Sequence, residues 1–133
     1  MKSNPYQAYQ QNSVLSAPPA ELTLMLYDGC LKFIRQGKAA ILAGDVSARN
    51  TALQKAQKII QEFIYTIDRN VPISKDYLRM YDFINRQLIK ANVSGDLETL
   101  VVAEELVSEF RDTWKQVMAK TRQAKVNQAS GQI

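Results

Sequence analysis

The sequence of 133 residues contains no histidine and one cysteine, Cys30. This composition excludes a disulfide framework, the usual zinc ligand sets and an imidazole general base. The sequence also lacks a glycine-rich phosphate loop, a Gly-x-Ser-x-Gly motif and the Glu-x-x-His pairs that bind metals inside helical bundles. Cys30 lies in an apolar stretch, which predicts a packed thiol rather than a nucleophile. We therefore predict that the chain is not an enzyme and needs no cofactor or metal.

Targeting signals and membrane spans are also missing from the sequence pattern. The first residues are polar and rich in amides, whereas a signal peptide needs a charged start followed by an apolar core. The longest apolar run is far shorter than the ~20 residues that cross a bilayer. We expect a single domain with a cytoplasmic location and no insertion into a membrane.

The net charge of +4 is unevenly distributed along the chain. The basic and acidic side chains of residues 1–112 balance, so the excess comes from Lys115, Lys120, Arg122 and Lys125. We expect these cations to lie at a helix C-terminus, where they complement the helix dipole. The alternative is a nucleic-acid-binding patch, which would need a basic face with stacking aromatic side chains.

The remaining sequence shows apolar residues at helical spacing and no sustained alternation typical of strands. Short connections between long amphipathic helices predict an all-α, antiparallel up-down-up-down four-helix bundle over residues 18–124. Residues 125–133 are expected to be a disordered tail. The N-caps predicted for the second, third and fourth helices are Asp45, Ser74 and Asp96. The predicted helices are 18–42, 46–68, 75–93 and 97–123.

The first predicted helix is apolar around more of its circumference than a bundle core requires. Only Asp28, Lys32 and Arg35 form a clear polar strip, so the apolar zone is roughly twice the ~100° of a surface helix. We infer that the first and third helices present apolar grooves to a partner segment, with core or self-association packing as the alternative. The candidate groove residues are Leu24, Tyr27, Leu31, Ile64, Ile67, Leu78, Phe83 and Val102.

Residues 1–17 precede this helix and have no helical periodicity. Tyr6 and Tyr9 are two aromatic residues in an otherwise polar run. One interpretation is an extended segment that packs on the apolar surface of the helices. The other is a disordered tail, which is common at chain ends.

Several runs of residues resemble the flagellar secretion chaperone family FliS. Two of them are specific: Asn4–Val14 (NPYQAYQQNSV) and Glu21–Ile34 (ELTLMLYDGCLKFI). The likeness extends over nearly the whole chain, and only the tail after Met118 lacks a signature. The other matching residues are Ala56, Ile59-Ile60, Met80–Ile84 and Trp114-Lys115-Gln116.

The resemblance implies a small cytoplasmic bundle that binds the disordered C-terminal region of flagellin before export. Binding would keep flagellin from polymerising early and present it to the export gate of the flagellar type III secretion apparatus. The resemblance further implies that Tyr6 and Tyr9 belong to a lid that moves when flagellin binds. It also suggests a regulator of flagellar gene expression as a further partner. Two other hypotheses stay open: a homodimeric structural bundle, and a basic nucleic-acid-binding bundle.

Overall fold

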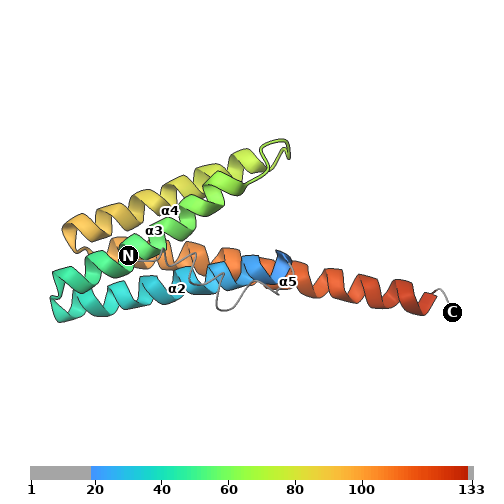
Figure 1. Ribbon diagram of the computed structural model, residues 1–133, viewed down its shortest axis with the longest axis horizontal. Helices are drawn as coiled ribbons and strands as arrows, with labels where there is room; N and C mark the ends of the chain where they lie inside the picture. Colours follow the sequence, from blue (N-terminus) through green and yellow to red (C-terminus); the bar gives the residue numbers. More distant parts are fainter. Residues whose placement is uncertain (1–18, 132–133) are drawn as a thin grey trace, which may run out of the picture.

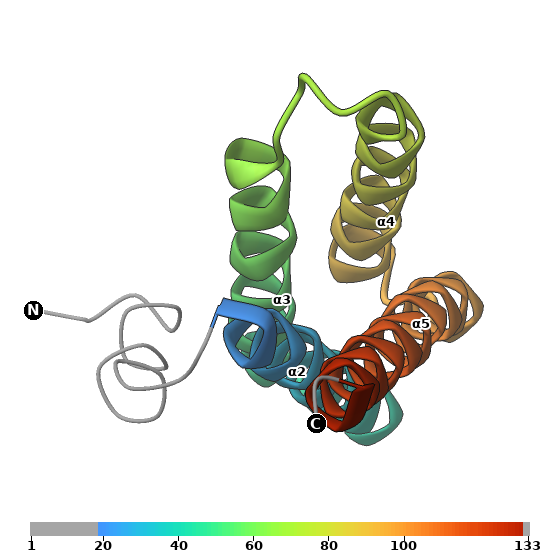
Figure 2. The ribbon, with the colours of Figure 1, turned by 90° about the vertical axis from the view of Figure 1, so that its right-hand side faces the viewer.

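The structure is a computed structural model that describes residues 19–131. The described residues form four helices and no strand: α2 (Pro19–Ala43), α3 (Val46–Thr66), α4 (Ser74–Ser94) and α5 (Leu97–Gly131). The helices run alternately up and down in an antiparallel bundle (Figure 1, Figure 2). Around the bundle, α2 contacts α3 and α5, and α4 closes the ring between α3 and α5. The prediction of an all-α four-helix bundle is confirmed. Among these helices, none is long and apolar enough to cross a membrane.

Two of the turns form as the sequence predicts. Gly44 and Gly95 both adopt positive φ angles, of 69° and 71°, which a residue without a Cβ adopts at little cost. The carboxylate of Asp45 caps α3 by accepting a hydrogen bond from the backbone N–H of Ala48 at 3.0 Å. Asp96 caps α5 in the same way.

The start of α4 differs from the prediction that Ser74 is its N-cap. Ser74 is instead the first helical residue, and Ile73 occupies the cap position without a capping side chain. The Ser74 side chain is buried, and its hydroxyl donates to the backbone carbonyl of Asp68. Ser74 therefore holds the α3–α4 connection closed rather than capping α4.

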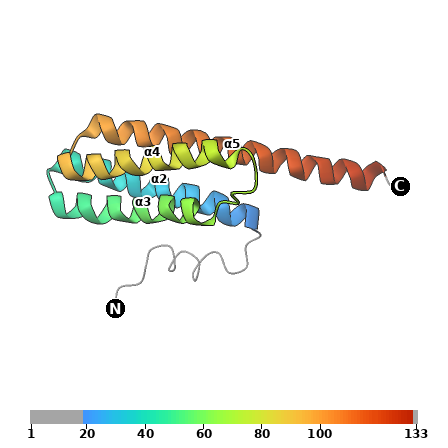
Figure 3. The same cartoon turned by 90° about the horizontal axis from the view of Figure 1, so that it is seen from above.

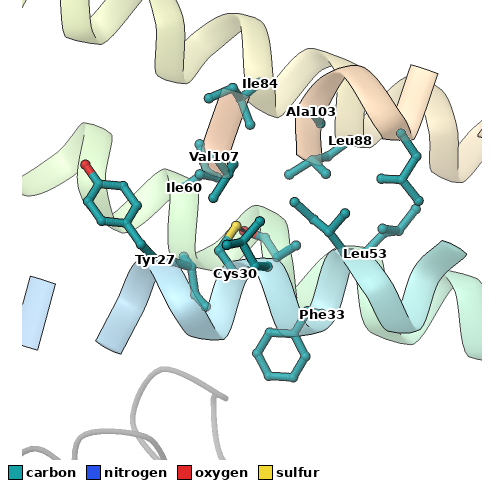
Figure 4. Close-up of a cluster of buried hydrophobic side chains, with 14 of the residues drawn as sticks. Tyr27, Cys30, Phe33, Leu53, Ile60, Ile84, Leu88, Ala103 and Val107 are labelled. Atoms are coloured by element: carbon teal, nitrogen blue, oxygen red, sulfur yellow. Dashed lines mark hydrogen bonds between the residues drawn. The ribbon is translucent and has the colours of Figure 1, made fainter. Parts of the chain in front are cut away.

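The core is built from aliphatic side chains of all four helices, and α2 is buried on two sides (Figure 4). Because α2 lies between α3 and α5, most of its wide apolar surface packs inside the monomer. The inference that α2 carries a large excess of exposed apolar surface is therefore wrong for most of its length. At Gly37, α2 approaches α3 so closely that a Cβ built on the glycine would lie 2.5 Å from Cδ2 of Leu53. Phe33 points away from the other labelled core residues in Figure 4 and is covered in part by the Lys55 ammonium, 5.5 Å from the ring centre.

The last helix is longer than predicted and extends past the bundle (Figure 3). Residues 119–129 are exposed, yet α5 continues to Gly131, so the predicted disordered tail is helical as far as that residue. No glycine or proline occurs between Leu97 and Gly131, and the segment is rich in Ala, Lys, Gln and Arg, which favour helix. The end of packing near residue 119 is therefore not the end of the helix.

The bundle is open at one end. The α3–α4 hairpin diverges from the α2–α5 pair toward the 67–73 connection, whereas the four helices stay close at the opposite end (Figure 1). The open end brings together the first half of α2, the end of α3, the start of α4 and the middle of α5. It carries large aromatic side chains, and helix separation increases with the size of the side chains at the contact. This geometry creates the site described next.

Candidate functional site

A hollow of about 250 Å³ lies at the open end of the bundle, and we call it the end hollow. All four helices contribute to its walls, which are mainly apolar and aromatic. Its threonines add little polar chemistry, because the hydroxyls of Thr23 and Thr66 donate to the carbonyls of Pro19 and Glu62 in their own helices. The lining residues are Thr23, Tyr27, Phe63, Thr66, Ile67, Tyr77, Tyr81, Phe110, Thr113, Trp114 and Val117.

Five aromatic rings form a stacked cluster along one wall of the end hollow. Tyr27 stacks on Phe63 with ring centres 4.6 Å apart, and Phe63 stacks on Tyr81 at 5.5 Å. Phe110 lies 5.3 Å from Tyr81 and contacts Tyr77 edge-on at 5.6 Å. These rings are supplied by four helices, so the wall is fixed by the fold and not by one flexible segment. Pairs in such arrangements contribute about 0.5–1.5 kcal/mol beyond the burial of their area.

The hydroxyl groups of Tyr27 and Tyr81 place one polar point in this apolar wall. Their oxygens are 2.7 Å apart and buried. Burial raises the pKa of both phenols well above the usual value, so both stay protonated at neutral pH. One hydroxyl hydrogen is used within the pair. No second protein partner for either hydroxyl lies within residues 19–131.

A second hollow of about 170 Å³ follows the seam between α4 and α5, and we call it the seam hollow. It shares Tyr77, Phe110 and Thr113 with the end hollow, so the two are neighbours with a common wall. Their combined surface leads from the open end onto the outer face of the α4–α5 pair. The remaining lining residues of the seam hollow are Met80, Leu106 and Glu109.

The structure brings only part of the predicted groove set to these hollows. Tyr27 and Ile67 line the end hollow, while Ile64 is half-buried and packs against the core. Leu31 is a core residue with 1% of its surface exposed, so its prediction as a groove residue is wrong in this structure. Leu24 and Leu78 are half-buried, Phe83 and Val102 are exposed, and these four line neither hollow. Tyr6 and Tyr9 lie outside the described residues.

Most residues of the hollows are absent from the predicted groove set, because their helical spacing places them on the inner faces of their helices. Examples are Tyr77 and Tyr81 in α4 and Phe110 and Trp114 in α5. One signal in the sequence points to them: five of the large aromatics fall in the first half of α2, the end of α3, the start of α4 and the middle of α5, which an antiparallel bundle brings together. Helical periodicity predicts which face of each helix is buried. The position of the aromatic residues along the helices indicates where in the bundle the packing is least compact.

Nothing in the described residues suggests catalysis or metal binding. Burial raises the pKa of the Cys30 thiol to about 12, and its sulfur lies 3.8 Å from the backbone carbonyl of Ala56. A thiol with this pKa is almost fully protonated at neutral pH and therefore a poor nucleophile. Within residues 19–131, no group of three or more His, Cys, Asp or Glu side chains is placed to hold a metal ion.

Comparison with known proteins identifies the family. The profile of the family "FliS: Flagellar protein FliS" matches residues 2–121. The chain belongs to the FliS family. Its sequence is 50% identical over 119 residues to the flagellar secretion chaperone FliS of Bacillus subtilis (strain 168), covering 90% of each chain. It is 30% identical over 117 residues to that of Salmonella typhimurium (strain LT2), covering 86% of this chain and 87% of the other.

A solved structure supports the fold of this FliS-family chain. The structure is described as the crystal structure of a flagellar chaperone from bacteria, and it matches with a TM-score of 0.72. The match covers 86% of this chain and 95% of the other at 16% sequence identity, so it shows the bundle architecture alone. Because FliS is a family of chaperones, the prediction that the protein is not an enzyme is confirmed.

Proposed function

We propose that this FliS-family protein is a cytoplasmic export chaperone for flagellin. It binds the disordered C-terminal region of flagellin with apolar side chains of that region in the end hollow and the seam hollow. Binding prevents premature polymerisation and presents flagellin to the export gate of the flagellar type III secretion apparatus. The main support is the pair of adjoining apolar hollows at the open end of a bundle whose relatives are named flagellar secretion chaperones.

The size of the hollows favours a peptide over a small molecule. Each is smaller than the roughly 300–1,000 Å³ of typical small-molecule sites, at about 250 and 170 Å³. Two neighbouring side-chain-sized hollows suit a helical segment with apolar residues at i, i+3, i+4 and i+7.

Two anchor side chains are not sufficient for firm binding of a disordered client. Ordering the client costs about 2–5 kcal/mol or more, while each fully buried apolar anchor contributes about 1.5–3 kcal/mol. Further contacts are therefore needed along the bundle. Leu24, Leu78, Phe83 and Val102 are the predicted groove residues outside the hollows whose partial or full exposure is compatible with this role.

We propose that the N-terminal segment regulates access to the end hollow. The helix that follows it, α2, begins at Pro19, and the backbone carbonyl of Ala20 accepts a hydrogen bond from the Trp114 indole at 2.8 Å. Trp114 lines the end hollow, so the first turn of α2 lies beside that hollow. We propose that Tyr6 and Tyr9 cover the end hollow until the client displaces them.

The experiment is a titration of the full chain with a peptide from the C-terminal region of flagellin. At equimolar ratio the peptide should gain helix by circular dichroism, and calorimetry at several temperatures should give a negative heat-capacity change. Flagellin truncated at its C-terminus serves as the control and should not bind. Absence of both heat and helix gain with the intact peptide would reject the proposed function.

The alternative of a homodimeric structural bundle rests on the closed end of the molecule. Leu42, Val46 and Val93 are largely exposed there, at the adjoining ends of three helices. Two copies that buried these residues would leave the open end accessible. Sedimentation at micromolar concentration tests this alternative, which requires a stable dimer that flagellin does not change.

A further inference from the structure

The protruding part of α5 carries the whole net charge of the protein. After Asp112 the chain has four cations, Lys115, Lys120, Arg122 and Lys125, and no acidic side chain. All four are exposed, and none takes part in an ion pair within the described residues. An exposed helix that is polar all round and has no internal ion pairs gains little stability from interactions between its own side chains.

The helix dipole does not account for these cations. Its influence is confined to about the last turn of a helix. Because α5 continues to Gly131, Lys125 lies six residues before the end, and the last turn contains no basic residue. The expectation that the cations lie at the helix C-terminus is therefore wrong, and their clustering requires another explanation.

A third hollow, of about 220 Å³, lies where α5 leaves the bundle, and we call it the notch. The first turn of α2 forms one side with Ala20 and Glu21, and α5 forms the rest. The indole of Trp114 is fixed there by its hydrogen bond to the Ala20 carbonyl. The α5 residues that line the notch are Trp114, Val117, Met118, Thr121, Arg122 and Lys125.

Two of the four cations lie at the notch and a third faces away from it. At ~100° per residue, Arg122 and Lys125 lie within about 60° of each other, whereas Lys120 lies about 140° around the helix from Lys125. The notch thus combines an apolar floor of Trp114, Val117 and Met118 with two cations on its α5 side, Arg122 and Lys125, against one carboxylate, Glu21, on its α2 side, which leaves a positive excess.

We propose that the notch is a second protein-interaction site, which binds an acidic amphipathic segment of another protein. An apolar side chain of that segment packs on the Trp114–Met118 floor, and its carboxylates pair with Arg122 and Lys125. An acidic segment is proposed because its charge complements Arg122 and Lys125. Charge complementarity gives protein interfaces specificity and fast association. This site is separate from the proposed flagellin site in the end and seam hollows, although Trp114 and Val117 form the ridge between the end hollow and the notch.

Two other occupants fit the notch less well. The protein's own residues 1–18 contain Lys2 and no acidic side chain, so they offer no charge complement to Arg122 and Lys125. Nucleic acid would need stacking aromatics beside the cations, and residues 115–133 contain none. Trp114 itself is half-buried and already hydrogen-bonded.

The test uses the full chain and a fluorescent, helix-forming peptide with Leu and Phe along one face and Glu on both sides of that face. Two further probes are the same peptide with Ser in place of Leu and Phe, and a single-stranded oligothymidine of equal charge. The variant Lys125→Glu has a matched control in Lys120→Glu, the same charge reversal on the same helix. Both positions are exposed, so both variants should fold as the parent does by circular dichroism.

The expected result, at near-physiological salt, is at least fivefold weaker binding of the amphipathic peptide for Lys125→Glu and less than a twofold change for Lys120→Glu. The Ser peptide and the oligothymidine should bind at least fivefold more weakly than the amphipathic peptide. Equal losses in the two variants, equal binding of either control probe, or no binding at micromolar concentration would overturn the proposal. Thr113→Arg, which alters the end and seam hollows alone, should leave this binding unchanged, so the two proposals fail independently.

Discussion

The hydroxyl oxygens of Tyr27 and Tyr81 lie 2.7 Å apart and join α2 to α4, the two helices on one diagonal of the bundle. Both side chains also line the end hollow. The two tyrosines therefore link α2 to α4 by a hydrogen bond at the end of the bundle where the α3–α4 hairpin diverges from α2 and α5 (Figure 1).

This pair predicts strong coupling between the two tyrosines. Tyr27→Phe leaves the Tyr81 hydroxyl without its buried partner, and we expect a loss of about 1–2 kcal/mol in the free energy of unfolding. Tyr81→Phe should cost a similar amount for the same reason. The double variant removes both polar groups and should be less destabilised than the sum of the single variants by about 1 kcal/mol. Urea denaturation of the four proteins measures this coupling, and strictly additive losses would contradict it.

The ion pairs of Glu104 predict a dependence of stability on pH. Burial by itself would raise the pKa of Glu104, but the hydrogen bonds and charges of Lys38 and Arg35 outweigh it and hold the pKa below its usual value. A lowered pKa in the folded state contributes stability above the unfolded pKa of 4.5, and this contribution is lost as the pH falls through the folded pKa.

Glu104→Gln should therefore lower the free energy of unfolding at neutral pH by about 0.5–1 kcal/mol, because both cations are partly exposed. The difference from the parent protein should shrink as the pH falls below 4.5 and disappear below the lowered folded pKa, where the carboxylate is protonated in both states. Glu105→Gln is the matched control, since Glu105 is exposed and forms no ion pair among the described residues. A difference that persists at acid pH would show that Glu104 acts through packing instead.

The buried thiol of Cys30 allows a simple test of the core packing. Burial leaves none of its surface exposed and raises the pKa of the thiol to about 12. In the native protein we expect a thiol reagent such as a nitrobenzoate disulfide to react far more slowly than with the urea-unfolded chain. Rapid reaction under native conditions would mean that the α2–α3 contact around Cys30 opens readily.

The sequence was sufficient for the parts of the fold that depend on local chemistry. Turn glycines and capping carboxylates identify helix ends through local hydrogen bonds, as at Gly44-Asp45 and Gly95-Asp96. It failed at Ser74, because the hydroxyl bonds to Asp68 six residues earlier and not to its own helix. The sequence also predicted too early an end for α5. Apolar periodicity reports which residues are buried, and α5 continues beyond its buried part.

The candidate site was harder to predict for a different physical reason. Periodicity places Tyr77, Tyr81 and Phe110 on the inner faces of their helices, and the structure agrees. Whether an inner face packs against another helix or lines a hollow depends on how far the helix pairs separate, which is a tertiary property. Leu31 shows the opposite error, since its place in the wide apolar zone of α2 suggested a groove, but it is buried in the core.

The central claim, that the adjoining end and seam hollows bind flagellin, depends most directly on Thr113. This residue is exposed and lines both hollows, so an arginine there should fill them without disturbing the core. Gln116→Arg adds the same charge on the same helix at an exposed position that lines neither hollow. The decisive measurement is the calorimetric affinity of the two variants for the flagellin C-terminal peptide. We predict at least tenfold weaker binding for Thr113→Arg and a change below twofold for Gln116→Arg, whereas parent-like affinity of a folded Thr113→Arg protein would contradict the account.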